Sequence, residues 1–190
     1  MAATSNSVGN EAIVLMGGNQ PAVTGNAPTW DNSTVGLALQ QLYTPCVQTV
    51  AKEFGWDFAR NTVVLALTGN APTDPNWTYE YTYPGNGVEV WQLMPTALVD
   101  KNNPLPIRWA VGNNLVAAVQ TKVIWSNQQN ALANYNNVPS EATWDVLFRE
   151  AVVRLLASEL STALAGKPDT AQMFIQTSEA FEQIGETRGA

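Results

Sequence analysis

The chain has 190 residues and a formal net charge of −7, with no histidine and one cysteine. Charged residues make up only 13% of the sequence, about half of their usual share. The nine basic residues are scattered along the chain, whereas a groove that grips nucleic acid needs clustered Lys and Arg. Without histidine, imidazole metal sites and the usual Ser or Cys catalytic triads are excluded. The single cysteine, Cys46, excludes an intrachain disulfide and a cysteine-based zinc site.

A surface with so few charges is typical of a protein that is covered by partners, because a solitary protein usually keeps about a quarter or more of its surface charged. The first residues, Met1–Gly9, lack the basic region and the apolar run of a signal peptide. No stretch approaches the ~18 apolar residues of a membrane span. We therefore expect a protein that is made and used in a cytoplasm-like compartment, without contact to a membrane.

The N-terminal part of the sequence predicts two helices separated by a loop. An apolar, helix-favouring run predicts the first helix over residues 5–16, ended by two glycines. Residues 19–29 carry Gly and Pro and predict the loop. The second helix follows possible caps at Asp31–Ser33 and ends at Gly55, with a kink expected near residues 41–43 because Pro45 removes a hydrogen bond. Its apolar stripe is expected to contain Val35, Leu39, Leu42, Cys46 and Val50, widened by Val47, Ala51 and Phe54.

From residue 61 the pattern changes to short runs in which apolar and polar residues alternate, as they do in strands. We expect a turn at Pro84–Gly87 and a hairpin turn at Gly112–Asn114. Short strands at this spacing are typical of a small antiparallel barrel or sandwich. The predicted strands cover residues 62–67, 77–83, 88–94, 108–111, 115–118, 122–125 and 131–135.

The C-terminal part predicts two further helices. Thr143 is expected to cap the third helix, with Asp145 in its first turn; Gly166 ends it and Pro168 opens the fourth. The expected buried stripes are Phe148, Val152, Leu155, Leu156, Leu160 and Ala163 in the third helix, and Phe174, Thr177, Phe181 and Ile184 in the fourth. The helical segments can bury these stripes only against each other. The predicted fold class is therefore α+β, with a four-helix bundle built from residues 1–60 and 140–190 and a small antiparallel β barrel or sandwich inserted at residues 61–139.

No pattern of side chains nominates a residue for catalysis, for a cofactor or for a metal. Acidic residues do not cluster, and the three on one side of the last helix, Glu179, Glu182 and Glu186, are interpreted as a solvated face, with channel lining as the alternative. The hexapeptide Thr-Gly-Asn-Ala-Pro-Thr occurs at residues 24–29 and again at 68–73. We interpret the two copies as turn-rich connectors, with a functional loop pair as the alternative. The tryptophans are assigned to the core or to a subunit interface, with a sugar or base platform as the alternative.

Several segments in chain order carry a resemblance to a known family. They are Asn10–Ile13 with Gln20–Val23, Leu42–Tyr43 with Gly55–Ala59, Tyr79–Pro84 leading into Val88–Val90, Tyr135–Ser140 with Trp144–Phe148, and Leu155–Ser161. Their order and spacing together resemble the tail tubular protein A family, the head-to-tail adaptors of short-tailed bacteriophages. Two positions depart from the family pattern, because Cys46 stands where many relatives carry Arg and Tyr83 stands where Leu is usual.

The resemblance implies a structural virion protein of the tail connector. Such an adaptor forms a homo-oligomeric ring of about twelve copies, closed by head-to-tail contacts. It docks beneath the portal protein, receives the tail nozzle protein, and lets the genome DNA pass during ejection without binding it tightly. The family has no catalytic residues and no cofactor to transfer. The resemblance therefore implies a protein that is assembled in the host cytoplasm and is not an enzyme.

Two other classes of function stay open at this point. The count of Trp and Tyr allows a carbohydrate-binding β module with helical flanks, which a screen with sugars would separate from an adaptor. Paired carboxylates would allow an enzyme without histidine, although the acidic residues of this sequence do not cluster.

Overall fold

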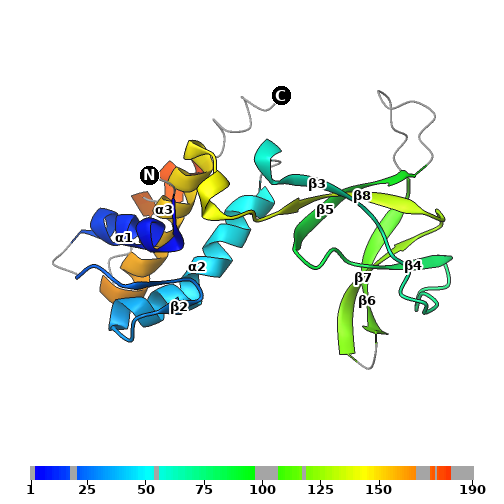
Figure 1. Ribbon diagram of the computed structural model, residues 1–190, viewed down its shortest axis with the longest axis horizontal. Helices are drawn as coiled ribbons and strands as arrows, with labels where there is room; N and C mark the ends of the chain where they lie inside the picture. The colour runs from blue at the N-terminus through cyan, green and yellow to red at the C-terminus, as the bar shows by residue number, and fades with distance from the viewer. Residues whose placement is uncertain are drawn as a thin grey trace. The chain divides into compact units, whose positions relative to one another are not determined.

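A computed structural model describes residues 3–17, 21–53, 56–96, 107–116, 119–165, 172–173 and 175–180 (Figure 1). The chain divides into two compact units. Residues 1–59 and 138–190 form the first, which we call the helical unit, and residues 60–137 form the second, which we call the β unit.

Helix α1, Ser5–Met16, begins at a capping box. The Thr4 hydroxyl oxygen accepts a hydrogen bond from the Ser7 amide at 3.1 Å, and the Thr4 amide donates to the Ser7 hydroxyl at 3.0 Å. Gly17, with a φ of 70°, ends the helix. The predicted helix over residues 5–16 is therefore confirmed. The segment predicted as a loop contains a short antiparallel ribbon of β1, Gly25–Asn26, and β2, Thr29–Trp30, so that part of the prediction is wrong.

Helix α2, Thr34–Glu53, continues through Pro45. Its N-terminus is capped as predicted within Asp31–Ser33, because the Ser33 hydroxyl accepts a hydrogen bond from the Gly36 amide at 3.0 Å. Most of the predicted stripe is buried, but Tyr43 is buried where Leu42 was expected, and Leu42 is only half-buried. Phe54 and Gly55 lie outside the described residues. None of the helices in the described ranges combines the length and hydropathy needed to cross a membrane.

Helix α3, Val146–Leu160, packs against both α1 and α2. Its cap is Asp145, whose carboxylate accepts a hydrogen bond from the Leu147 amide at 2.8 Å. The prediction of Thr143 as the cap is wrong, because Thr143 belongs to a preceding 3-10 turn, Glu141–Thr143, and its hydroxyl donates to the Ser140 carbonyl. A π-helical turn, Ser161–Ala165, follows α3.

Residues 172–173 and 175–180 are helical as well. The Ser178 hydroxyl is buried and donates to the Ala151 carbonyl of α3 at 3.1 Å. Gly166, Pro168 and most of the stripe predicted for the fourth helix lie outside the described residues: Phe174, Phe181 and Ile184.

The β unit contains two three-stranded antiparallel sheets. The first has the order β3, Arg60–Val64, then β8, Ala131–Asn137, then β5, Gly87–Pro95. The second has the order β4, Tyr79–Thr82, then β7, Val119–Ser126, then β6, Trp109–Val116. Both sheets contribute to one apolar core, formed by Leu65, Tyr81, Val90, Leu93, Ile124, Ala131, Ala133 and Tyr135.

The predicted architecture, a four-helix bundle with one inserted barrel or sandwich, is wrong. The fold is α+β with three small antiparallel sheets, one of which, the β1–β2 ribbon, lies within the helical unit. The helices differ in length, from 12 residues in α1 to 20 in α2, and α3 is followed by a π-helical turn. In the β unit β3 and β5 pair with β8, whereas β4 and β6 pair with β7, so the strands divide into two sheets. Periodicity shows which segments are strands, but it does not show which strands pair.

Each predicted strand overlaps an observed strand, but the predicted hairpin turn is misplaced. β6 runs straight through Gly112–Asn114, and its register with β7 is continuous from Trp109 to Val116. Residues 109–111 and 115–116, which were assigned to two different strands, therefore belong to one strand.

Candidate functional site

Two side chains of the helical unit that could take part in chemistry, Cys46 and Tyr43, are buried. Burial raises the pKa of the Cys46 thiol to about 12, and the negative charge of Glu159 adds to the effect. A thiol held in its neutral form is a poor nucleophile. The Tyr43 hydroxyl donates to a Glu141 carboxylate oxygen at 3.0 Å, and burial, followed by the Glu141 charge, raises the pKa of Tyr43. Within the described ranges, no group of three or more Cys, Asp or Glu side chains is placed to hold a metal ion.

The β unit contains a buried carboxylate, Glu80 on β4, which is only 1% exposed. One oxygen accepts a hydrogen bond from the Thr68 hydroxyl at 2.7 Å. The other accepts from the side-chain amide of Asn114 at 2.7 Å and from the Trp125 indole at 2.9 Å. A buried charge is tolerated only when its hydrogen-bonding capacity is met, and these donors come from β6, from β7 and from the segment before β4. Glu80 therefore ties these three parts together, and we call this group the Glu80 clamp.

Gly112 on β6 makes room for the clamp. A Cβ atom at this position would lie 2.3 Å from the Trp125 ring, well inside van der Waals contact. Gly112 is thus required because the indole approaches its Cα closely. Asn114, two residues further along β6, is required because it donates a hydrogen bond to the Glu80 carboxylate. This explains the misplaced turn, because Gly-Asn-Asn is ordinary turn composition but here serves side-chain packing in the middle of a strand.

The second hexapeptide copy, residues 68–73, belongs to the same clamp. Asn70 donates from its side chain to the Leu115 carbonyl at 3.0 Å, and Asn114 donates to the Ala71 carbonyl at 3.3 Å. The first copy is built alike: the Thr24 amide and hydroxyl donate to the Asp31 carboxylate at 2.6 and 3.2 Å. In both copies the Thr binds an acidic side chain and the following Gly has a positive φ, 89° and 82°. Both copies are therefore structured connectors.

Within the described part of the β unit, no third strand pairs with the far end of the β6–β7 hairpin. β4 pairs with Val123–Ser126 only, which leaves Asn113–Val116 and Val119–Lys122 as a two-stranded ribbon that we call the distal hairpin (Figure 1). Leu115 and Val119 are each 62% exposed, and Val111 at its base is 44% exposed. The connector at residues 68–73 holds the β6 side of this ribbon through Asn70 and Asn114. Exposed apolar side chains mark contact surfaces. The distal hairpin is therefore the candidate interaction surface of the β unit.

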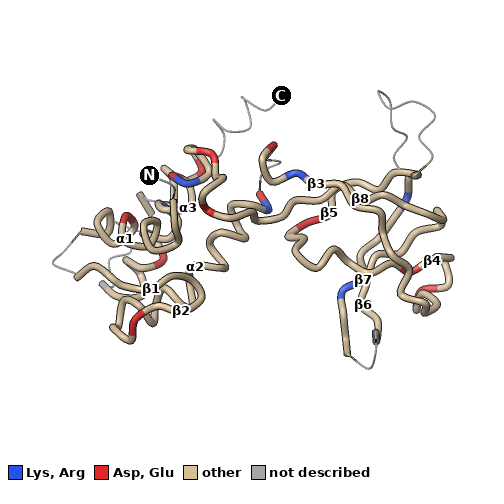
Figure 2. Tube along the Cα trace, viewed as in Figure 1, with Lys and Arg blue, Asp and Glu red and all other residues tan. Residues whose placement is uncertain are grey.

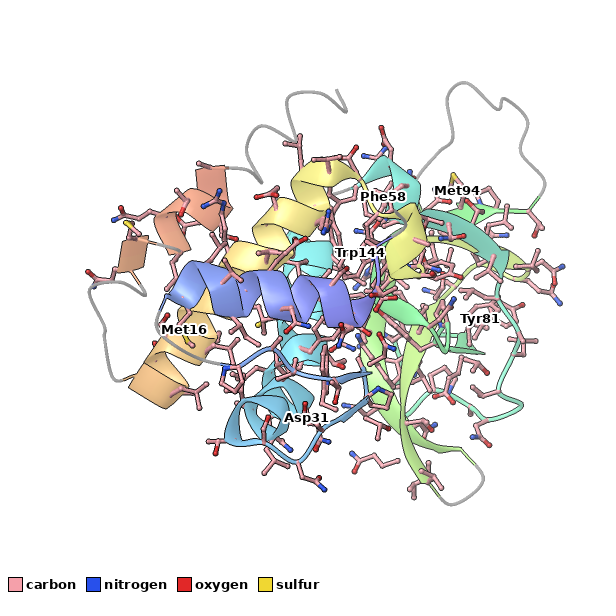
Figure 3. All side chains as sticks on the ribbon, turned by 60° about the vertical axis from the view of Figure 1, so that its left-hand side comes forward. Met16, Asp31, Phe58, Tyr81, Met94 and Trp144 are labelled. Carbon is pink, nitrogen blue, oxygen red and sulfur yellow. The ribbon has the colours of Figure 1, made fainter. Side chains whose placement is uncertain are left out.

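The helical unit has a pocket of about 240 Å³. Its floor is apolar and buried, with Val47 and the Tyr43 ring, and Glu141 supplies a carboxylate. The volume is below the range of about 300–1,000 Å³ that is usual for small-molecule sites. Figure 3 labels Trp144, a half-buried wall of the pocket. The other lining residues are Ala27, Pro28, Thr44, Gln48 and Val138.

The tryptophans do not form an exposed platform. Of the seven, all within the described residues, only Trp91 is exposed, at 45%. The Arg60 guanidinium carbon lies 5.8 Å from the centre of its ring, a cation–π contact that covers part of one face. No specific observation therefore favours the carbohydrate-binding module.

No family model matches this chain, and no curated protein matches it at a significant level. The features described here were not nominated from the sequence: the Glu80 clamp, the distal hairpin and the pocket. The one signal for the hairpin was its composition, because Lys122 is the only charged residue from Trp109 to Ser126.

Proposed function

We propose that the protein is a structural adaptor of a short-tailed bacteriophage virion, which forms a ring between the portal protein and the tail nozzle protein. The observation that carries this proposal is the distal hairpin, whose apolar side chains are exposed while its base is fixed by the Glu80 clamp. An arm of this kind suits permanent contact with another subunit, because free apolar strands are an aggregation hazard in a solitary protein.

The charge distribution supports passage of DNA without retention. The net charge is −7, and Figure 2 shows that charged residues are sparse along the strands of the β unit. Retention of DNA needs several Lys or Arg that neutralise neighbouring phosphates. In the proposed ring the genome therefore slides past the subunits during ejection.

The proposal is tested by co-sedimentation with purified portal rings. The protein alone should stay near the top of a sucrose gradient, and in the presence of portal rings it should move with them. An equal amount of a ring-shaped protein from an unrelated source serves as the control. Sedimentation of the protein at the same position with and without portal rings would exclude the adaptor function.

A further inference from the structure

We propose that the distal hairpin of one copy of this chain docks into the pocket of the helical unit of the next copy, with Leu115 as the inserted side chain. The inference rests on the proposed ring and names the contact that closes it. A ring needs a heterologous contact, in which two different surfaces of one chain fit each other. Among the described residues, the distal hairpin is an exposed apolar surface and the pocket is an apolar recess, and the two lie in separate compact units.

The register of the hairpin places an apolar side chain and a cation on the same face. Leu115 pairs with Gln120, and Asn113 pairs with Lys122, so Leu115 and Lys122 lie diagonally on one face of the ribbon. The Lys122 ammonium nitrogen lies 3.9 Å from the centre of the Tyr83 ring, a contact that fixes where this charge stands. Asn114 and Thr121 form a pair on the opposite face, where Asn114 binds Glu80.

The pocket offers the complementary arrangement. Val47 and Trp144 supply apolar contact for an aliphatic side chain, and Glu141 is the charged residue among the lining side chains. One Glu141 oxygen accepts the Tyr43 hydroxyl, which fixes the carboxylate at the pocket wall. In the proposed contact, the Leu115 side chain packs against the apolar lining of the pocket, and the Lys122 ammonium lies near the Glu141 carboxylate. From this charge complementarity we infer that a second copy of this chain occupies the pocket. Lys122 is the only charged residue of the distal hairpin, and the remainder of the chain has an excess of acidic residues.

The Glu80 clamp holds the distal hairpin in place, which lowers the conformational entropy that is lost when the hairpin docks. The Glu80 clamp acts on the face of β6 and β7 that carries Asn114 and Trp125. Leu115 lies on the opposite face of the distal hairpin and is 62% exposed, as is Val119 on the face of the clamp. A hairpin that is already held in its bound form loses little conformational freedom on docking, which favours association.

The contact is tested by disulfide cross-linking in a Cys46→Ala background. One chain carries Leu115→Cys and a second carries Gln48→Cys, at the exposed rim of the pocket. The chains are mixed, with and without portal rings, and oxidised. The expected result is a cross-linked dimer from the mixture and a ladder from a chain with both substitutions. The matched control, Thr121→Cys on the opposite face of the ribbon, should give severalfold less cross-linking with the Gln48→Cys chain.

A charge exchange gives an independent readout. Lys122→Glu and Glu141→Lys should each reduce severalfold the amount of this protein that co-sediments with portal rings, and the chain that carries both substitutions should recover it. Cross-linking that is absent with and without portal rings, or equal for Leu115→Cys and Thr121→Cys, overturns the proposed contact. If rings still form on portals in that case, the adaptor function stands and another surface closes the ring. A distal hairpin that cross-links to the portal protein instead of to a second copy would likewise overturn the proposal.

Discussion

Phe148 lies at the centre of an aromatic cluster in the helical unit. Its ring centre lies 5.3 Å from that of Trp56, 5.1 Å from that of Phe58 and 4.9 Å from that of Trp144, each in an edge-to-face arrangement. Phe58 and Trp144 are labelled in Figure 3. Such pairs add about 0.5–1.5 kcal/mol each beyond the burial of apolar area. Phe148 itself is fully buried, so this one side chain holds the start of α3 to the end of the segment that follows α2.

Phe148→Ala should therefore lower the free energy of unfolding by about 3–5 kcal/mol, as large-to-small changes in a packed core do. Urea denaturation followed by circular dichroism measures the loss. The matched control is Val146→Ala on the same helix, where the side chain is 72% exposed and the change should stay within about 0.5 kcal/mol. A loss below about 1 kcal/mol for Phe148→Ala would contradict the cluster.

Asp31 links acid stability to the first hexapeptide copy. The Ser33 hydroxyl, followed by the amides of Thr24 and Ser33, lowers the pKa of Asp31 from 3.8 to about 2. Because the folded pKa lies below the unfolded pKa, the ionised carboxylate stabilises the fold above about pH 4, and this contribution is lost as the pH falls toward about 2.

Asp31→Asn should make stability less dependent on pH over that interval. Urea midpoints measured from about pH 5 down to about pH 2 should fall less steeply for the variant than for the parent chain. The control is Glu53→Gln, at the exposed end of α2. Equal slopes for Asp31→Asn and the parent would show that the Asp31 hydrogen bonds do not stabilise the fold.

At the scale of single elements, hydrophobic periodicity predicted helix α1 and most of the buried face of α2, because local spacing determines which side chains share a face. The misplaced turn arose where residues serve distant partners, because Gly112 makes room for the Trp125 ring and Asn114 donates to Glu80. The error over the cap of α3 is local, because Asp145 accepts a hydrogen bond from the Leu147 amide two residues ahead. A local pattern cannot distinguish a glycine needed for a turn from a glycine needed for close packing. The Glu80 clamp and the pocket bring together residues from separate elements, so no local pattern in the sequence indicates either of them.

Gly112→Ala tests the reason for the misplaced turn. The added Cβ would overlap the Trp125 ring, whose indole is held by Glu80, and overpacking of this kind costs about 1–3 kcal/mol. Gly85→Ala is the matched control, because a Cβ there meets no atom within 4 Å. Thermal unfolding monitored by tryptophan fluorescence compares the two variants. If both melt at the temperature of the parent chain, Gly112 is not required for the packing of Trp125.

For the whole molecule, the change of pattern along the sequence indicates that helical ends flank a β segment, and the structure divides into a helical unit and a β unit. The arrangement within each unit depends on strand pairing and helix contacts between residues far apart in the sequence, such as β3 with β8. Such pairing leaves no periodic trace. Contacts with partner proteins leave no periodic pattern in the sequence either. The surfaces of this chain that make such contacts are indicated only by exposed apolar residues such as Leu115.

The division into units predicts that the helical unit folds alone. Residues 60–137 are replaced by a flexible Gly-Ser linker, and lengthening such a linker costs only about 0.6 kcal/mol per doubling. The variant should keep its helical circular dichroism and a cooperative thermal transition, but it should not form rings on a portal. Outright unfolding would mean that the β unit contributes to the core of the helical unit.

The adaptor function itself is tested most directly by electron microscopy of purified portal rings before and after addition of this protein. We expect a second ring of about twelve copies stacked on one end of the portal, with the central channel open. The parent chain and a Leu115→Asp variant are compared at equal concentration, and the variant should leave gaps in the second ring or fail to form it. Portal rings that remain unchanged at saturating amounts of the folded parent protein would contradict the adaptor function.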